Sequence, residues 1–572
     1  MKNQFVANTL YMIADLLDLK GEIFFKTRAY RIAAQTIESL DDDIEKLVNQ
    51  GSLELIPGVG EALAKKITEL VKTNKLEYLE RLKKEVPISL INLLKIPGLG
   101  PRKVSVLYKK LGITNIESLK IAAEKGELRS LEGFGEITER NILRGIQLLE
   151  KTSGRVLLNV AYEDGIKYRN YLQNCKKISK VNIAGSLRRM KETIGDLDIL
   201  TCSSHPDAAM EYFINYPEVA QVLAKGTTKS SVLLKDNLQV DIRIVEEKSY
   251  GAALQYFTGS KDHNVVLRSL AIKKGFKLNE YGLFDKKNEK YVAGKTEEEI
   301  YKKIGLQYIE PELRENRGEF EAVQKKIPLP HLVRYDDIHG DFHVHSSWSD
   351  GTDSIKTIAS DAQKRDYSFI GITDHSQSLK IANGLDKERI QKKIKEITKV
   401  NNKFPHLRIL CGTECDIKTD GTLDYSDKIL KQFDFVYIGI HTAFKMDKKA
   451  MTKRIIKGME NEHVNFMAHP TGRLIGKRDP YEVDIEQIID AAKETDTLLE
   501  INSFPDRLDL NDTHVKLARE HGIKFVLGTD SHSINHLDFM RFGIATARRG
   551  WLEKKDILNT YSVKDIEKII GM

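Results

Sequence analysis

In the first 150 residues, apolar positions recur every three or four residues, which is the spacing of one buried face of a helix. The pattern is clear in residues 7–20, 31–40 and 62–73, and turns that contain glycine separate these segments. No strand is needed to explain this region. It therefore predicts an all-helical part of the chain, which we divide into domains at 1–85 and 86–150.

The pattern changes after residue 150 to short runs rich in β-branched and apolar residues, with helical segments between them. The four clearest runs are at 180–186, 195–202, 230–235 and 238–245. They predict an α+β domain over 151–250, and residues 251–318 form a smaller mixed module.

A linker is predicted at 319–335, where two prolines lie in a charged context. From 336 to 572, apolar strand-like runs alternate with helical segments to the end of the sequence. This alternation favours parallel β/α architecture that closes into a distorted, TIM-like barrel.

Length and composition indicate a soluble protein of several domains. The 572 residues exceed what one hydrophobic core usually organises. No apolar run approaches the roughly 20 residues that cross a bilayer, and the first residues mix acids into a helical pattern, unlike a signal peptide. The four cysteines show no CxxC spacing, which favours reduced thiols over a disulfide framework. We expect a cytoplasmic protein.

Charge and histidine are distributed unevenly. The formal charge is +9 over residues 1–335 and −2 over 336–572, and 12 of the 15 histidines follow residue 335. The net positive charge of residues 1–335 suits a region that binds a polyanion, although ordinary variation in charge among solvated surfaces explains it equally well. The histidines indicate a second kind of chemistry in the last third.

Three similar segments in the helical region, at 55–67, 95–107 and 130–142, each place an apolar-x-Gly-apolar-Gly step between two helices. Paired glycines allow close backbone approach, so that the amides at the start of the next helix can face a phosphate. The first two pairs are Gly58 with Gly60 and Gly98 with Gly100. These segments resemble the helix-hairpin-helix motif, which binds DNA backbones without reading sequence. A plain tight turn is the alternative, and it is least easily dismissed for the acidic third segment.

Three carboxylates lie in apparent strands of the α+β domain. Asp196 and Asp198 alternate along one run and therefore share a face, and Asp241 lies in another apolar run. Such a set is a hard-oxygen site that two Mg²⁺ ions can occupy during nucleotidyl transfer. Gly185, Ser186, Arg188 and Arg189 come shortly before Asp196. They offer a closely approachable backbone, a hydroxyl and two guanidinium groups, which are suited to binding triphosphate oxygens. Surface acids on an edge strand are the alternative.

Residues 183–200 and residues 256–284 resemble segments of the family X DNA polymerases. The resemblance covers roughly residues 1–315. The resemblance implies that Asp196, Asp198 and Asp241 are catalytic metal ligands, and that Gly185, Ser186, Arg189 and Gly195 bind the nucleotide. It further implies a thumb in which Tyr256 and Phe257 contact the sugar, Gly259 bends the chain, Asn264 meets the base edge and Arg268 supports the template. The sequence departs from the family's eukaryotic pattern at Lys261, which replaces an acid.

The same family can carry a 5′-deoxyribose-phosphate lyase in its N-terminal domain. The matching nucleophile is Lys66, with Lys26 and Tyr30 as contacts to the 5′-phosphate and Lys65 as the cation that would lower the nucleophile's pKa. Ala62 replaces a basic residue of the family. We therefore favour a solvated helix face for these lysines.

Candidate metal ligands recur at the ends of the C-terminal apolar runs. They are His343, His345, Asp350, His375, Glu414, His441, His469, Asp530 and His532. If the strands are parallel, all these ends lie on one face of the barrel. Nine ligands exceed one tetrahedral zinc site and suit two or three Mn²⁺ or Zn²⁺ ions. A lone histidine at a strand end is usually a satisfied core residue, but this recurrence argues against that alternative.

Other polar residues of this region receive different expectations. Asp341 and Asp374 are expected to orient ligands rather than bind metal. We expect the remaining histidines on helices or loops to be surface residues, namely His463, His514, His521 and His536.

The region resembles the polymerase and histidinol phosphatase (PHP) domain, and its fusion behind a family X polymerase looks like the bacterial polymerase X architecture. The resemblance implies Mn²⁺-dependent 3′–5′ exonuclease activity and, in some members, abasic-site cleavage or removal of 3′-phosphates. We expect a monomeric gap-filling enzyme of base excision repair, associated with the nucleoid, that acts on gapped or primer-template DNA and deoxynucleoside triphosphates. A non-templating nucleotidyltransferase joined to a small-molecule phosphatase and a non-catalytic DNA scaffold are the alternatives.

Overall fold

The computed structural model describes residues 2–38, 40, 43–56, 58–94, 96, 99–152 and 154–572. It separates into two compact units, one made of residues up to 153 with 476–479 and one made of residues 154–475 with 480–572. Within these ranges, no helix has both the length and the apolar character that a membrane span requires. Gly98 of the second predicted hairpin lies outside the described residues.

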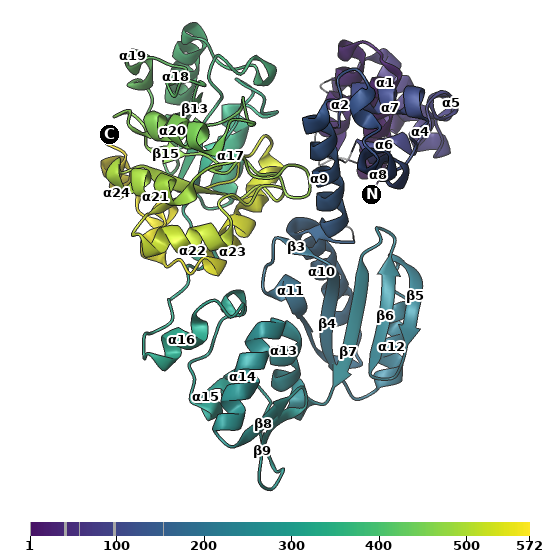
Figure 1. Ribbon diagram of the computed structural model, residues 1–572, viewed down its shortest axis with the longest axis vertical. Coiled ribbons are helices and arrows are strands. Elements are labelled where there is room, and N and C mark those ends of the chain that lie inside the picture. Colours follow the sequence, from purple (N-terminus) through teal and green to yellow (C-terminus); the bar gives the residue numbers. More distant parts are fainter. Residues whose placement is uncertain are drawn as a thin grey trace. The chain divides into compact units, whose positions relative to one another are not determined.

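The first unit is helical throughout its described part, as predicted (Figure 1). Its helices are α1 (Lys2–Lys20), α2 (Phe24–Glu38), α3 (Ile44–Gln50), α4 (Glu61–Thr73), α5 (Glu77–Glu85), α6 (Leu90–Leu93), α7 (Pro101–Leu111), α8 (Ile116–Glu124) and α9 (Glu136–Thr152). The apolar face of α1, with Leu10 and Leu17, is fully buried in a core that also contains Ile67 and Val104. The three-to-four spacing in the sequence is therefore the spacing of this buried face.

Glycines open the two helices that follow the first and second predicted hairpins. Gly60 is the N-cap of α4, and Gly100 is the N-cap of α7. Gly58 has a φ of +83°, and a Cβ there would lie 2.7 Å from Cγ2 of Ile32. A side chain at this position would therefore meet both backbone strain and a steric clash.

The α+β domain is built on a five-stranded sheet in the order β2-β4-β7-β6-β5. Its strands are β2 (Ile178–Ile183), β4 (Asp196–Ser203), β5 (Val219–Lys225), β6 (Lys229–Leu234) and β7 (Gln239–Val245), with β4 and β7 parallel. A two-stranded ladder joins β1 (Val156–Leu157) to β3 (Thr193–Ile194), and the helices are α10 (Leu158–Gln173), α11 (Gly185–Arg188) and α12 (Pro206–Ile214). Strand β5 was not predicted. Ala220, Val222 and Ala224 alternate along this edge strand, but it is exposed along most of its length.

The next module contains α13 (Tyr250–Thr258), α14 (Lys261–Lys273), α15 (Glu297–Ile304) and a three-stranded sheet of β8 (Phe276–Asn279), β9 (Gly282–Asp285) and β10 (Tyr291–Ala293). The predicted linker at 319–335 starts with a helix, α16 (Glu319–Gln324), whose Glu319 and Phe320 are buried. Glu319 accepts a hydrogen bond from Asn316 N and lies 2.9 Å from Nδ1 of His263, so this part of the segment packs against the module.

The last part of the second unit is a nearly closed parallel barrel of seven strands in sequential order. The strands are β11 (Gly340–Val344), β12 (Phe369–Ile372), β13 (Arg408–Asp416), β14 (Phe435–Gly439), β15 (Phe466–Met467), β16 (Leu498–Asn502) and β17 (Phe525–Gly528). A bridge between Val344 and Ser531 joins the first and last strands. The predicted parallel β/α barrel is confirmed.

Helices connect the strands and cover the barrel (Figure 1). They are α17 (Ile355–Lys364), α18 (Lys387–Asn401), α19 (Asp427–Leu430), α20 (Lys448–Met459), α21 (Ile485–Glu494), α22 (Asp512–Glu520), α23 (Met540–Arg549) and α24 (Val563–Ile569).

Aromatic rings fill one layer of the barrel. The ring of Phe435 contacts those of Phe342 and Phe466, with centroids 5.7 and 5.5 Å away. Two neighbouring strands make room for it with glycine, since a Cβ on Gly371 or Gly412 would lie 2.7 or 2.4 Å from Cζ of Phe435. The layer is therefore packed so closely that one added methyl group would displace the ring.

We expect Gly412→Ala to lower the free energy of unfolding of the barrel by about 1–3 kcal/mol, because the methyl group overpacks this layer. Urea unfolding followed by tryptophan fluorescence measures it selectively, since Trp348 and Trp551 are the two tryptophans of the chain and both follow residue 335. An unchanged midpoint would show that the layer relaxes without cost.

Candidate functional site

The three predicted polymerase carboxylates lie together at one end of the sheet. Asp198 of β4 and Asp241 of β7 are direct partners across the parallel ladder, and Asp196 lies two residues earlier on the same face of β4. Burial together with the charges of Asp196 and Asp241 raises the pKa of Asp198 to about 7. Carboxylates that repel one another in this way favour a cation between them.

The backbone before β4 approaches one of these carboxylates closely. Gly185 has a φ of +63°, and a Cβ there would lie 2.2 Å from Oδ2 of Asp198. The amide of Ala184 also donates to the backbone oxygen of Asp198, at 2.8 Å. The start of α11, with Ser186, is therefore fixed against the carboxylate, and Gly195 lies directly before β4.

Both arginines of this segment are engaged by carboxylates. Nη2 of Arg188 lies 2.6 Å from Oε2 of Glu297. Nε of Arg189 donates to Glu315 at 3.0 Å, and its Nη1 donates to the backbone oxygen of Thr258. Arg189 would have to leave these partners to reach a triphosphate, so its binding of phosphate stays a prediction.

The predicted thumb residues gather where α13 turns into α14. The rings of Tyr256 and Phe257 meet edge to face, with centroids 5.2 Å apart, and Gly259 has a φ of +55° at the turn. Asn264 donates to the backbone oxygen of Tyr256 at 2.7 Å, and Arg268 donates to that of Asn264 at 3.3 Å. The structure brings these residues together, and their contacts with a base pair stay predictions.

The predicted lyase lysine lies on α4. Burial, Lys26 and Arg81 lower the pKa of Lys66. The neighbour expected to have this effect, Lys65, instead pairs with Glu61 at 2.7 Å. The expectation that Lys65 lowers the pKa of Lys66 was wrong because consecutive residues of a helix point in different directions, and Lys65 faces Glu61, four positions earlier.

Tyr30 is buried, and its ring stacks on that of Tyr78 at 6.3 Å. Nζ of Lys66 lies 5.0 Å from the centre of the same Tyr78 ring. Tyr30 therefore serves the packing around the lysine, and its contact with a 5′-phosphate stays a prediction.

The nine predicted ligands of the barrel converge on one rim. His343 and His345 belong to β11 and its end, Glu414 belongs to β13, and the others follow strands β12, β14, β15 and β17 or lie in the first loop. Among them, Nε2 of His343 and Nε2 of His345 lie 3.1 Å apart. Oε1 of Glu414 lies 2.8 Å from Nε2 of His469 and 3.0 Å from Nε2 of His441.

Three groups within this cluster bring their ligand atoms within 4.8 Å of one another. The groups are His345, Asp350, His375 and His532; His343, His345 and Asp530; and His375, Glu414 and His441. Because neighbouring groups overlap at His345 and His375, the cluster as a whole offers more ligands than one ion needs and would hold more than one.

Buried polar atoms at the cluster support this interpretation. Nδ1 of His345, Oδ1 of Asp350, Nδ1 of His375 and Oε2 of Glu414 are buried and have no hydrogen-bond partner. Buried polar atoms are normally paired, and a divalent cation would supply the partner that each of these atoms lacks. The donor set of imidazoles and carboxylates fits Mn²⁺ or Zn²⁺.

Further residues support the ligands from behind. Asp341 accepts from the amide of the ligand candidate His343 at 3.0 Å, whereas Asp374 pairs with buried Lys393 at 2.9 Å, so that an orienting role of Asp374 stays a prediction. The sequence analysis missed Glu500, which accepts from Nδ1 of His343 at 2.6 Å. It also missed Asp416, which binds Nδ1 of His441. Both follow apolar strand residues, and an acid in such a strand is a signal that could have identified them.

The expectation of a surface position was wrong for His463, His514 and His536, which are half-buried, whereas His521 is exposed. Nδ1 of His536 accepts from the amide of His532 at 3.3 Å, and its ring stacks on that of Phe539. Burial lowers its pKa to about 4, so it stays neutral at physiological pH. A short helix after β17, at Ile534–Phe539, turns it towards the cluster.

Comparison with known proteins connects both sites to one family. Models for a helix-hairpin-helix domain, a SAM-like helix-hairpin-helix tandem, the DNA polymerase beta thumb and the PHP domain match residues 1–76, 90–147, 253–315 and 341–504. A protein of Bacillus subtilis named DNA polymerase/3′-5′ exonuclease PolX is 40% identical over 572 residues, which cover 100% of this chain and 99% of that protein. The chain belongs to the PolX family.

Two more distant relatives match the two halves separately. DNA polymerase lambda of Rattus norvegicus is 25% identical over 55% of this chain and 56% of its own. A probable phosphatase of Thermoanaerobacter is 28% identical over 40% of this chain and 91% of its own.

We expect Glu500→Gln to weaken Mn²⁺ binding at the barrel about 10- to 100-fold, because the carboxylate orients His343 and increases its basicity. Electron paramagnetic resonance of free Mn²⁺ during a titration measures the affinity without reference to activity. Glu494→Gln, on an exposed position of α21, is the matched control. Equal affinities for the two variants would remove Glu500 from the site.

Proposed function

We propose that this chain is a DNA-directed DNA polymerase that fills gaps in base excision repair and trims 3′ ends with its C-terminal domain. The observation that carries the proposal is the presence, in one chain, of both clusters: paired carboxylates on adjacent strands and nine imidazole and carboxylate ligands on a barrel rim. The substrates are gapped or primer-template DNA and deoxynucleoside triphosphates. The enzyme acts as a monomer in the cytoplasm, at the nucleoid.

In the polymerase site, Asp196, Asp198 and Asp241 would hold two Mg²⁺ ions. Bound there, the ions would help to activate the primer 3′-hydroxyl and would neutralise charge on the triphosphate. Gly185 and Ser186 offer a close backbone and a hydroxyl to the phosphates, and Asn264 lies on the thumb helix that faces the base pair. The helical hairpins bind the DNA backbone through amides at Gly60 and Gly100 without reading sequence.

In the barrel, the nine ligands hold two or three ions, with Mn²⁺ preferred. Bound there, such ions would activate a water molecule and neutralise charge on a phosphodiester. Glu500 and Asp416 fix the imidazoles of His343 and His441, so that the ring nitrogen facing the cluster is free to bind metal. The same chemistry extends to abasic sites and 3′-phosphates, and the resemblance of the barrel to a probable phosphatase supports the latter.

Asp198→Ala should abolish nucleotide addition and leave DNA binding nearly unchanged, because the carboxylate holds metal whereas the hairpins hold the DNA backbone. Primer extension on a one-nucleotide gap and a binding titration measure the two effects. Asp207→Ala, at an exposed position of α12, is the matched control. A normal extension rate in Asp198→Ala would refute the assignment.

The two sites should be separable by metal. Carboxylates accept Mg²⁺ readily, whereas imidazole-rich ligation favours Mn²⁺. We therefore expect Mg²⁺ alone to support synthesis and Mn²⁺ to activate degradation of a 5′-labelled primer. Replacing His343 and His345 by alanine should remove degradation and spare synthesis, and His521→Ala, at an exposed histidine, should change neither. Degradation that survives the double substitution would place the nuclease elsewhere.

A further inference from the structure

One carboxylate oxygen is shared by two arginines that belong to different domains. Oε1 of Glu315 accepts from Nε of Arg189 at 3.0 Å and from Nη1 of Arg549 at 3.1 Å. Arg189 follows α11 in the polymerase domain, and Arg549 ends α23 on the barrel. Although burial acts in the opposite direction, Arg549, Arg189 and Lys191 hold the pKa of Glu315 below its usual value, so the carboxylate is charged.

Arg549 is held in place independently of this carboxylate. Its side chain is buried and forms an ion pair with Asp512 of α22. Its Nη1 also donates to the backbone oxygen of Arg189 at 2.7 Å. Arg549, on the barrel, therefore places a fixed positive charge beside Glu315. It also holds the backbone of Arg189, whose side chain binds the same carboxylate oxygen.

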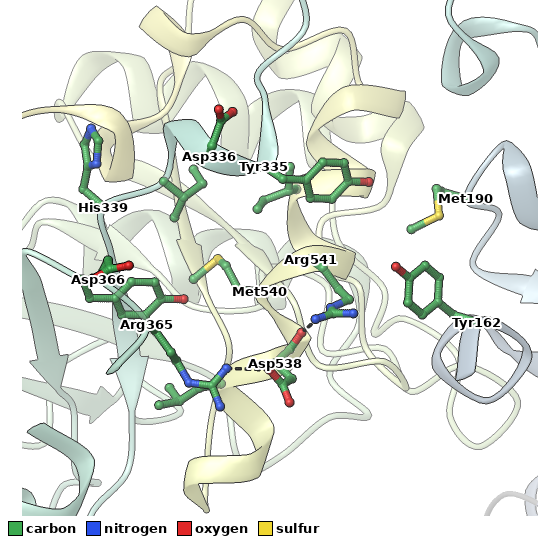
Figure 2. Close-up of a pocket in the computed structure, with 14 residues that line it drawn as sticks. Tyr162, Met190, Tyr335, Asp336, His339, Arg365, Asp366, Asp538, Met540 and Arg541 are labelled. Carbon is green, nitrogen blue, oxygen red and sulfur yellow. Dashed lines mark hydrogen bonds and ion pairs between the residues drawn. The ribbon is translucent and has the colours of Figure 1, made fainter. Parts of the chain in front are cut away.

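The segment that follows Arg189 is not tightly packed on every side. Met190 and Tyr162 lie opposite Tyr335 and Arg541 across a cavity of about 690 Å³ (Figure 2). The guanidinium of Arg541 lies 5.4 Å from the centre of the Tyr162 ring. Beside this open space, the backbone of the segment is held by its own hydrogen bonds, such as that from Met190 N to the oxygen of Leu187 at 2.9 Å, and in addition by Arg549.

We propose that Arg549 is a positioning residue for the polymerase reaction, because by sharing Glu315 it allows Arg189 to leave that carboxylate for the incoming triphosphate. This rests on the proposed binding of triphosphate by Arg189. Leaving a buried carboxylate without a guanidinium partner costs free energy, because the charge is then unpaired. While Arg549 stays on Glu315, Arg189 can depart without creating such a group. Without Arg549, Glu315 retains Arg189.

The test is steady-state gap filling with a varied deoxynucleoside triphosphate. Arg549→Ala should raise KM for the nucleotide roughly tenfold and change kcat by less than about twofold, since a tenfold change needs only one charged hydrogen bond. Adding Glu315→Gln to this variant should return KM to within about threefold of the wild-type value, because a neutral amide no longer retains Arg189. A merely structural role of Arg549 would not be rescued in this way.

The matched control is Arg548→Ala, on the same helix. Arg548 donates to Glu312 at 2.7 Å and to the backbone oxygen of Val333 at 2.8 Å, so its loss removes a comparable ion pair without affecting Glu315. It should leave KM unchanged. Degradation in Mn²⁺ by each variant reports whether the barrel is folded. If Arg549→Ala proves unfolded, Arg549→Lys keeps a charge beside Asp512 but cannot span both acceptors, and should raise KM in the same direction.

Arg189→Gln separates this inference from the proposed function. If Arg189→Gln leaves KM unchanged, the triphosphate role of Arg189 fails, and the inference fails with it. If Arg189→Gln raises KM but folded Arg549→Ala does not, only the role of Arg549 is overturned. The same holds if Glu315→Gln fails to restore KM in the Arg549→Ala background.

Discussion

The carboxyl ends of parallel strands share one rim, and the barrel site depends on this constraint. Ligands that are far apart in the sequence, such as His343, Glu414 and Asp530, come within a few ångströms because each lies at or near the end of its strand. The bridge between Val344 and Ser531 completes the arrangement by joining the first and last strands. The polymerase carboxylates also meet across a parallel pair of strands, but at the opposite ends, since Asp198 and Asp241 lie near the amino ends of β4 and β7.

Much of the fold could be predicted because burial leaves a periodic signal. The helices of the first unit and the seven barrel strands each have an apolar pattern, and their ligands follow those strands directly. Strand β5 was missed because it is mostly exposed and carries only a short apolar alternation, at Ala220, Val222 and Ala224. The start of the predicted linker was misjudged for the opposite reason, since Glu319 is a charged residue that is buried beside His263.

The site was predictable where residue type alone limits the chemistry, as for a cluster of histidines and acids at strand ends. It was not predictable where partners are chosen by tertiary contact. Nothing near Arg189 in the sequence indicates that Glu315 binds it, and Lys65 was a poorer guide to the environment of Lys66 than Lys26 and Arg81, which come from other helices. Long charged side chains reach partners that no local spacing specifies.

The approach of Gly185 to Asp198 has a consequence for the history of this chain. A single methyl group at that position would compete for space with a carboxylate oxygen, although every acid of the site would remain in the sequence. Divergence at this glycine could therefore turn a bifunctional enzyme into a nuclease with an inert companion domain. A relative that keeps all three aspartates but carries a larger residue there should not be assumed to synthesise DNA.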